Sequence, residues 1–562
     1  MTAPRRSLLV LLTTLAAAAP ASAAVAPGAV TFPVEAASSQ HTVDAFTPGL
    51  AAARPTGSAL LAGADAHGRL LLVAVGRDGS LDRAFGRQGI ARVALPAPAT
   101  RPAPLQLLID REGRPLVVFA GAALARDQLP QMLVARLTPA GALDGSYGAG
   151  GVAAVGTQVG CGGGCTPTAL APDGSLVTTG ATGSFPAAPG APRTLTWVVR
   201  RLTPAGAVDT GFGSQGTAAV VTGDAAGHSV AVLGDGSVVT AGTVAGSAQV
   251  ARLTAAGTAD PGFHAGMPLD LGAALGTVDL AARAGGAVDV LAYTSTSARI
   301  VRVTAAGIPD PAFGAGGTVT LPFGYSGTAG LVARPDGSAL VTTAPFSDNS
   351  GARPALTAYA VSPAGDVGAP LVIRVPFAGG LASVAAHIRP VAVMPLEQSR
   401  YGAGRPVLRP DGSLFVPGSV AVTQYTGEGT GFGHYEVAAA SLTPALTLDP
   451  AFGGPARPAR IAISVPAQRA RTDGQRRSFR VAVQATASGP GLALLTVRSG
   501  ARVLARSTAP VLHAGRQRLA ALLTVSGRRL LPHAHGVRVT VTAGFRDLVG
   551  QEARATARGR LE

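Results

Sequence analysis

Short runs of alternating apolar and polar residues fill most of the chain, and they recur with a regular period. The stretch LTPAGAVDTGFGSQGTAAVV at residues 202–221 returns from residues 137, 253 and 303, and in shortened form around Asp82 and Asp449. Alternating runs bounded by Gly- and Pro-containing turns are typical of β-strands. Their recurrence predicts a repeat fold, in which each unit buries its apolar face against its neighbours.

A hairpin centred on Asp-Gly is the second recurring element. It is clearest in LAPDGSLVTTG at residues 170–180, and similar segments begin at residues 54, 110, 232, 282, 333 and 408. We predict two-residue turns here, because such turns match the twist of antiparallel strands. Seven hairpins alternate with seven LDxxFG positions, of which the sixth has Gly368 in place of Asp. Each unit then supplies about four antiparallel strands, the content of a propeller blade.

These counts predict an all-β fold: a seven-bladed β-propeller over residues 27–456, followed by a small Ig-like β-sandwich. A closed ring is favoured over a linear array because closure protects the strand edges. With these residues in view, the units resemble the delta-60 repeat family, which reads approximately DGxLDxxFGxxGxV before a DG hairpin. The match is best at DGSLDRAFGRQGIARV, residues 78–93, and poorest in the sixth unit. The resemblance implies a bacterial β-propeller and implies no catalytic residue.

The repeated motif residues have a structural interpretation. Asp accepts hydrogen bonds from backbone N–H groups two residues on, and Gly permits a positive φ. We expect the aromatic residues to pack between blades; they are Phe85, Tyr147, Phe212, Phe263, Phe313 and Phe452. Calcium binding by the repeated Asp is the alternative, but each turn offers only one or two carboxylates where calcium needs several oxygen ligands.

The first 23 residues have the pattern of a secretory signal. Arg5 and Arg6 precede an apolar run, and Ala21-Ser22-Ala23 resembles a cleavage site. We therefore expect a secreted, extracellular protein, associated with the cell surface in one reading, with no transmembrane segment and in monomeric form. Cys161 and Cys165 are the only cysteines. In an oxidising compartment they most simply form a local disulfide, with free thiols or a metal site as the alternatives.

The seventh unit is the longest and holds the densest group of polar and aromatic side chains. The candidate ligand-binding residues there are Glu397, Arg400, Tyr401, Tyr425, Glu428, His434, Tyr435 and Glu436. Tyr rings beside acidic and Arg partners suit carbohydrate or peptide ligands, and loops on a rigid scaffold often carry binding residues. The alternative interpretation is a solvated insertion without a ligand.

Residues 457–562 differ from the repeats, with seven alternating segments that suggest an Ig-like sandwich. They contain nineteen Arg and four acidic residues, a formal charge of +15, while the whole chain carries +16. The expected partners are therefore an anionic cell-envelope polymer or glycan, or a protein, with nucleic acid less favoured. The alternative is that Arg serves only as a solubilising residue, since the chain contains no Lys.

Sequence signatures of common enzyme classes, such as HExxH, GxSxG and a Walker loop, do not occur. His533 and His535 are spaced for one strand face but have no third ligand nearby. We expect no cofactor and no metal. The sequence favours a secreted non-enzymatic binding or scaffold protein, with propeller loops for a ligand and a basic domain for envelope association. The alternative is an extracellular polysaccharide hydrolase or lyase that uses Glu397, Glu428 or Glu436.

Overall fold

The computed structural model describes most of the chain between Ala23 and Leu561. The described ranges are 23–26, 28–33, 50–65, 68–97, 99, 102–121, 131–158, 166–184, 194–274, 279–324, 327–345, 356–373, 401–403, 405–425, 431–453, 459–466, 480–488, 491–511, 515–531, 536–547 and 552–561. Nearly all regular structure in them is β-strand. Within these ranges no helix has the length and apolarity needed to cross a membrane.

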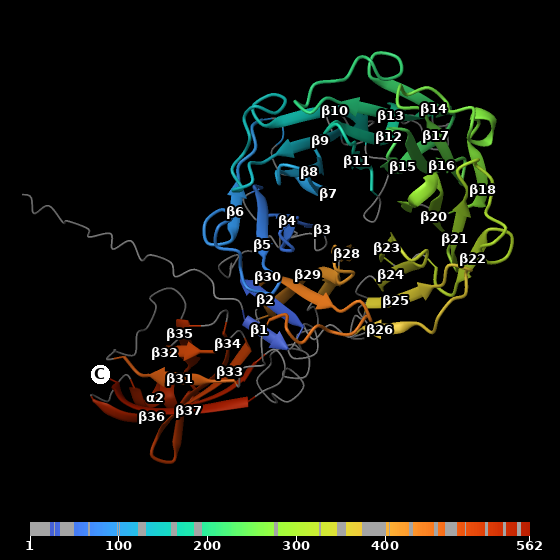
Figure 1. Ribbon diagram of the computed structural model, residues 1–562. Coiled ribbons are helices and arrows are strands. Elements are labelled where there is room, and N and C mark those ends of the chain that lie inside the picture. Colours follow the sequence, from blue (N-terminus) through green and yellow to red (C-terminus); the bar gives the residue numbers. More distant parts are fainter. Residues whose placement is uncertain are drawn as a thin grey trace, which may run out of the picture.

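The sheets are arranged around a ring, which makes the first part of the chain a β-propeller (Figure 1). Four sheets are meanders of four consecutive antiparallel strands. They are β3 (Leu50–Ala53), β4 (Ala59–Ala64), β5 (Leu70–Val75), β6 (Ile90–Val93); β15 (Ala225–Val232), β16 (Val238–Val244), β17 (Ser247–Leu253), β18 (Leu269–Ala273); β19 (Asp279–Ala282), β20 (Val288–Tyr293), β21 (Ala298–Val303), β22 (Thr318–Leu321); and β23 (Gly327–Ala333), β24 (Ala339–Pro345), β25 (Leu356–Val361), β26 (Leu371–Ile373).

A larger sheet contains two further meanders joined by the single pair Gln158 and Ala181. Its strands are β7 (Ala103–Ile109), β8 (Pro115–Ala120), β9 (Gln131–Arg136), β10 (Val152–Gln158), β11 (Thr168–Leu170), β12 (Leu176–Ser184), β13 (Thr194–Leu202) and β14 (Thr217–Thr222). Short 3₁₀ turns at His264–Gly266 and Ala284–Gly286 interrupt the strand pattern.

The last sheet of the ring combines both ends of the propeller sequence. β27 (Tyr401–Ala403), β28 (Val407–Leu408), β29 (Leu414–Tyr425) and β30 (Gly431–Leu442) are joined by β1 (Ala23–Ala26) and β2 (Ala29–Pro33). β2 pairs antiparallel with β30, from Ala29 opposite Ala440 to Pro33 opposite Glu436. Val30 packs in one apolar cluster with Phe415 of β29, with Phe452 of the turn after β30, and with β4 and β5 of the first meander. An N-terminal strand therefore connects the end of the ring to its beginning.

The Asp-Gly hairpins correct the prediction of two-residue turns. In the hairpin of β11 and β12, Ala171 N–H donates to Ser175 O at 2.8 Å and Gly174 N–H donates to Ala171 O at 2.9 Å. Gly174 has a φ of +84°, whereas Asp173 is not among the residues with positive φ. This is a type I turn followed by a left-handed glycine, a three-residue hairpin loop. All seven hairpins within the described residues share this hydrogen-bond pattern.

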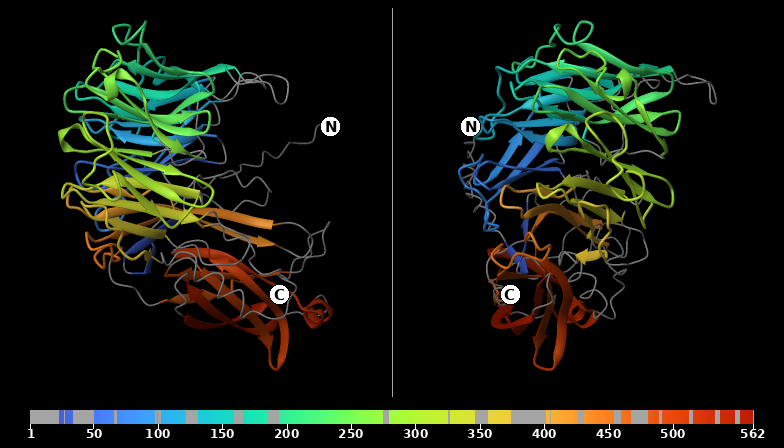
Figure 2. Two further views of the ribbon diagram at one scale, coloured as in Figure 1. Left: turned by 90° about the vertical axis from the view of Figure 1, so that its right-hand side faces the viewer. Right: turned by 45° about the vertical axis from the view of Figure 1, so that its right-hand side comes forward.

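Residues 457–562 contain two sheets outside the ring (Figure 2). One comprises β31 (Ile461–Ser464), β32 (Arg480–Ala487) and β35 (Gly515–Leu522); the other comprises β34 (Arg502–Val511), β33 (Gly491–Ser499), β36 (Val537–Asp547) and β37 (Glu552–Leu561). Both sheets contribute to one apolar core that includes Val483, Leu495, Val541 and Phe545. A short helix, α2 (Val525–Leu530), follows β35 and is capped by the Thr524 side chain, which accepts from Gly527 N–H at 3.1 Å.

Candidate functional site

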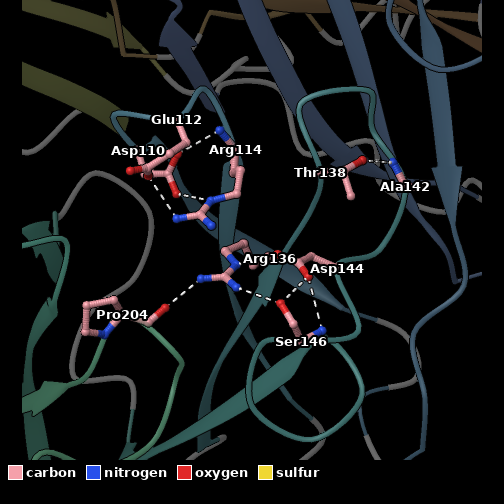
Figure 3. A network of polar contacts seen from close by, with 9 residues as sticks. All are labelled: Asp110, Glu112, Arg114, Arg136, Thr138, Ala142, Asp144, Ser146 and Pro204. Atoms are coloured by element: carbon pink, nitrogen blue, oxygen red, sulfur yellow. Dashed lines mark hydrogen bonds and ion pairs between the residues drawn. The ribbon is translucent and has the colours of Figure 1, made fainter.

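The repeated LDxxFG motif forms a contact that joins neighbouring meanders (Figure 3). Asp144 Oδ1 accepts from Ser146 N–H at 3.1 Å, and Asp144 Oδ2 accepts from Arg136 Nε at 2.8 Å. The same guanidinium donates at 2.6 Å to the carbonyl of Pro204, which lies in the next meander, and lies 4.6 Å from the ring centre of Tyr147. We call this set of Asp, Arg and aromatic side chains the junction clasp. As predicted, Asp144 accepts a hydrogen bond from the backbone N–H two residues on, and the aromatic residue packs where two meanders meet.

The clasp recurs with the same geometry in the two meanders that follow. Arg201 and Arg252 donate to Asp209 and Asp260 at 2.6 and 2.5 Å and to Ala255 O and Ala305 O of the following meanders at 2.9 and 2.7 Å. The aromatic side chains predicted as packing anchors are confirmed as buried, each no more than 1% exposed; they are Phe85, Tyr147, Phe212, Phe263, Phe313 and Phe452. The charged groups of the motif are therefore occupied by structural contacts.

The Asp residues of the hairpin turns are also held within their own turns. Asp173 Oδ1 accepts from the backbone N–H of Ser175 at 2.9 Å and from its hydroxyl at 2.6 Å. The same Asp-Gly-Ser contact holds the carboxylates of Asp235, Asp336 and Asp411 in their hairpins, and that of Asp78 in the turn after β5. The Ser hydroxyl is the main cause that lowers the pKa of each of these carboxyls, and it holds the pKa of Asp411 at about 2.

Asp411 also connects two meanders. It forms an ion pair with Arg77, which lies in the turn after β5, at the junction where the last sheet of the ring meets the first. The Asp-Gly hairpins and the LDxxFG turns consequently lie on the same face of the ring, which we call the turn face. The other face carries the connections between meanders and the hairpin loops that join second and third strands; we call it the loop face.

A buried ion pair lies at the centre of the ring on the loop-face side. Asp279, at the start of β19, is fully buried, and its carboxylate lies 2.9 Å from a guanidinium nitrogen of Arg405. It also accepts from the hydroxyl of Thr166 at 3.2 Å and from the N–H of Leu331 at 2.9 Å. Arg405 donates a further hydrogen bond to Leu331 O at 2.9 Å. We call these residues the axial network, because they join the innermost segments of four meanders.

Tyr293 lies beside this network at the end of β20. Its ring is 6.2 Å from the ring of Phe323, which stacks at 5.1 Å on Tyr359. Burial, followed by the charge of Asp279, raises the pKa of the Tyr293 hydroxyl well above its usual value. This hydroxyl has no hydrogen-bond partner within the described residues. Because both oxygens of Asp279 already accept hydrogen bonds, the network acts chemically as a tie between strands and leaves no free base.

The turn face carries an open cavity of about 340 Å³ between three successive hairpins. Its lining includes Asp110, Glu112 and Asp173, together with apolar residues such as Ile109 and Leu233. Arg114 pairs with both Asp110 and Glu112, at 2.6 and 2.9 Å (Figure 3). The carboxylates of this cavity therefore have partners within their own hairpins.

The candidate ligand residues of the seventh unit are only partly described. Tyr401 lies on β27 and pairs with Val420 of β29, which in turn pairs with Glu436 of β30. Tyr425 ends β29, while His434 and Tyr435 lie on β30 opposite Val422 and Ala421. The backbone register thus brings Tyr401 and Glu436 onto one row of the last sheet. Glu397, Arg400 and Glu428 lie outside the described residues, as do Cys161, Cys165, His533 and His535.

The arginines of the C-terminal domain differ from those of the ring. Exposed arginines follow one face of the four-stranded sheet; they are Arg498, Arg506, Arg538, Arg554, Arg558 and Arg560. Among the described residues of this domain no ion pair is formed, whereas the described arginines of the ring form eleven such contacts with Asp or Glu. Unpaired positive charge is therefore concentrated on this domain.

Sequence reasoning did not identify the clasp arginines or the axial network. The clasp arginines have a sequence signal, because Arg136, Arg201, Arg252 and Arg302 stand at the same place before each turn. The axial network has a weaker signal: Asp279 and Arg405 both stand four residues before the first residue of their hairpins, Arg283 and Arg409. These side chains and Thr166 meet only when the ring closes.

Comparison with known proteins supports the fold. A family model described as "Domain of unknown function (DUF5122) beta-propeller" matches residues 233–263. No curated protein matches the chain. Together with the ring of antiparallel meanders, the family match establishes a β-propeller scaffold.

Several solved structures resemble the chain at low identity. One is a protein of unknown function from Dyadobacter fermentans, with 10% sequence identity, a TM-score of 0.33 and a match that covers 60% of this chain and 94% of that chain. Another is the PQQ-bound aldose sugar dehydrogenase of Streptomyces coelicolor, with 13% identity, a TM-score of 0.31 and a match that covers 73% of this chain and 99% of that chain. A gluconolactonase of Xanthomonas campestris is also similar, with 13% identity, a TM-score of 0.27 and a match that covers 58% of this chain and 92% of that chain. At these TM-scores the activities of the neighbours carry no argument for this chain.

Proposed function

We propose that this protein is a secreted, non-enzymatic binding protein in which a rigid propeller is attached to the cell envelope by its basic C-terminal domain. The proposed propeller has seven blades of the delta-60 type over residues 27–456. The proposed C-terminal domain is Ig-like and begins at residue 457. A ligand or protein partner would bind at loops of the propeller, where Tyr401 and Glu436 share a strand row.

One observation supports the envelope association: arginines of the ring are paired with Asp, whereas described arginines of the C-terminal domain are not. In the ring, Arg136, Arg201 and Arg252 each have an Asp partner within 2.8 Å. In the C-terminal domain, the described arginines have no acidic partner among the described residues, and that domain carries +15 of the chain's +16. Unpaired surface charge attracts a surface of opposite sign, and outside the cell this surface is the anionic envelope.

The geometry of the ring supports a scaffold. Each clasp fixes one meander to the next through a guanidinium that bonds both, and the axial network fixes inner strands to each other. Such cross-connections limit relative motion of the blades and hold the loops in a fixed arrangement. Binding residues are commonly presented in this way, on loops positioned by a rigid framework.

Retention on an envelope preparation tests the proposal. The full-length mature protein is mixed with protein-stripped bacterial envelopes at low salt and then eluted with a NaCl gradient. We expect retention at about 0.05 M and release by about 0.5 M NaCl, because screening by salt shortens the reach of exposed charges. Envelopes whose carboxylates have been amidated are the control and should retain less protein. Absent retention, or retention that salt does not reverse, would contradict the proposal.

A further inference from the structure

The four-stranded sheet of the C-terminal domain has one apolar and one polar face. Leu495, Val497, Val541 and Phe545 belong to the core between the two sheets and are buried. Along β37 the pattern alternates strictly, with Ala and Gly half-buried and the intervening side chains exposed. The exposed face of β34, β33, β36 and β37, which we call the arginine face, is therefore turned to solvent.

Strand register aligns Arg and Thr in rows across the arginine face. Arg506, Thr496, Thr542 and Thr556 form one row of directly opposed residues over the four strands. Arg498, Thr540 and Arg558 form the next row. Neighbouring strands lie about 4.8 Å apart, and alternate residues along a strand about 6.8 Å. Guanidinium and hydroxyl groups thus recur at short intervals over the exposed face of the sheet.

Two of these arginines oppose each other directly. Arg538 of β36 pairs in register with Arg560 of β37, and both side chains are exposed. Like charges at directly opposed positions destabilise a sheet. Within the described residues, neither side chain has an ion pair or a hydrogen bond, and the same holds for Arg506, Arg554 and Arg558. This repulsion lowers the stability of the sheet, and a bound anion would reduce it.

We propose that the arginine face binds a linear polysaccharide that carries repeated carboxylate or sulfate groups. This inference rests on the proposed envelope association and names its binding surface and ligand chemistry. Guanidinium groups form bidentate contacts with planar anions, and they recur on this face as charged sugars recur along an anionic chain. The Thr hydroxyls between them supply donors and acceptors for the sugar hydroxyl groups.

Two other polyanions suit the face less well. Single-stranded nucleic acid binds mainly through aromatic side chains that stack on bases. The single aromatic residue in the described parts of these four strands, Phe545, is buried in the core. Anionic membranes favour exposed apolar side chains beside the charges. Among the residues of this domain whose side chains are described, the large exposed apolar ones are Leu522 and Val525, which belong to the other sheet and to α2.

The test compares two triple variants of the full-length protein that remove equal charge. R538Q/R558Q/R560Q alters the arginine face, and R516Q/R518Q/R529Q alters exposed arginines of β35 and α2. Dissociation constants are measured by biolayer interferometry at 50 mM NaCl against polygalacturonate and against fully methyl-esterified polygalacturonate. Vesicles of phosphatidylglycerol and phosphatidylcholine and a single-stranded DNA are measured in parallel.

We expect wild-type protein to bind polygalacturonate and to bind its methyl ester at least tenfold more weakly, because esterification removes the charge and keeps the backbone. The arginine-face variant should weaken binding about tenfold or more, since each exposed pair contributes a factor of a few. The control variant should change it less than about threefold. Equal weakening by both variants would overturn the proposal, as would tighter binding of the vesicles or the DNA.

The same variants separate this inference from the proposed function. If wild-type protein fails to bind envelope preparations, the envelope association is wrong. If wild-type protein is retained and R538Q/R558Q/R560Q is retained equally at every salt concentration, the association stands and the arginine face is not its surface. Unchanged thermal unfolding of both variants shows that each still folds.

Discussion

Each junction clasp takes its guanidinium from one of two positions, and the choice is visible in the residues. In the second, third and fourth meanders along the chain (β7–β10, β11–β14 and β15–β18), the Arg stands on the third strand. These residues are Arg136, Arg201 and Arg252. In the first meander that place is Ala74, and Arg54 of the hairpin instead pairs with Asp82 at 2.8 Å. The Arg54 side chain extends from the hairpin and not from the third strand, but its guanidinium still lies over the aromatic ring, here that of Phe85.

Not every unit pairs this Arg with the motif Asp: Arg302 pairs with Asp289, and Arg409 donates to the Ser441 hydroxyl. The sixth LDxxFG position lacks the carboxylate altogether. Arg334 occupies the hairpin place, but Gly368 stands where the other units have Asp. A buried guanidinium nitrogen of Arg334 accordingly has no partner within the described residues. The backbone of Gly368 matches that of the other units, since its N–H donates to Ala360 O at 2.9 Å, and its φ is not positive. A Cβ at this place would meet its nearest atom at 3.4 Å.

Gly368→Asp should therefore stabilise the protein. The new carboxylate gives Arg334 a partner, which we expect to raise the free energy of unfolding by about 1 kcal/mol. Gly368→Ala is the control and should gain only about 0.5 kcal/mol, because it restricts the unfolded chain without adding a charge. Thermal unfolding measures both. Equal stabilisation by Asp and Ala would show that Arg334 does not use the carboxylate.

A second residue change accompanies the lost motif of the sixth unit. In the other turns glycine is required by two constraints: Gly141 has a φ of +90°, and a Cβ there would lie 2.8 Å from the Phe85 ring of the preceding meander. The sixth unit has Leu371, 38% exposed, in place of the aromatic residue. The next turn accordingly carries Leu446, with a φ of +63°, and its side chain is 9% exposed. With no aromatic ring at position 371, the steric constraint that a ring imposes at Gly141 is absent from the preceding unit.

At the scale of the strand, the ring depends on β2, which is the element most distant in sequence from its partner. Val30 is 1% exposed and lies between the first meander and the last sheet. Gly28 N–H donates to Phe452 O at 2.8 Å, and Ser441 N–H donates to Gly28 O at 3.0 Å. These bonds join the two ends of the propeller sequence without a clasp of the kind that Arg136, Arg201 and Arg252 form.

Val30→Asp should open this closure. A carboxylate buried without a partner costs about 3–5 kcal/mol, which should lower the melting temperature and increase hydrogen exchange along β30. Ala219→Asp is the matched control, because Ala219 lies exposed on the outer strand β14, where the cost should stay within about 0.5 kcal/mol. If the two variants melt alike, β2 does not carry the closure.

Strand positions were largely predictable from the sequence, because alternation and turn residues are local signals. The seven alternating segments of the tail each overlap one of the strands β31 to β37. The hairpin turn type was not predictable from Asp-Gly alone. Pro172 at the first turn position and Ser175 after Gly174 favour a type I turn, since Pro fixes φ near −65° and the Ser hydroxyl bonds back to Asp173. Helix α2 was also missed, because its six residues carry no apolar periodicity.

At the scale of the whole molecule, the separation of charge between the two domains was predictable and the use of that charge was not. Counting residues locates the excess Arg in residues 457–562. It does not reveal that ring arginines such as Arg136 are paired while Arg558 is exposed, because pairing depends on register and on contacts between units. The ion pair of Asp279 and Arg405, 126 residues apart, likewise depends on contacts between units, although both residues occupy the same position of their repeats.

The hairpin carboxylates make acid stability a property of the entire ring. The pKa values of Asp173, Asp235 and Asp336 are lowered from 3.8, mainly by the Ser hydroxyl two residues on, and that of Asp411 falls to about 2. A carboxyl whose folded pKa is depressed contributes stability above its unfolded pKa and loses it as pH falls through its folded pKa. The melting temperature should therefore be steady near neutral pH and fall between about pH 4 and pH 2.

Removal of the hydroxyls should flatten this dependence. In S175A/S237A/S338A the three Asp pKa values return toward 3.8, so we expect a lower melting temperature at pH 7 and a smaller further fall between pH 4 and pH 2. T138A/T203A/T254A removes three turn hydroxyls that contact no carboxylate, and it should lower the melting temperature equally at all pH values. Calorimetry from pH 2 to pH 7 measures both variants. An acid-induced fall that the Ser variant leaves unchanged would mean that other carboxyls control acid unfolding, because the Ser-bonded aspartates would then contribute equally to the folded and unfolded states.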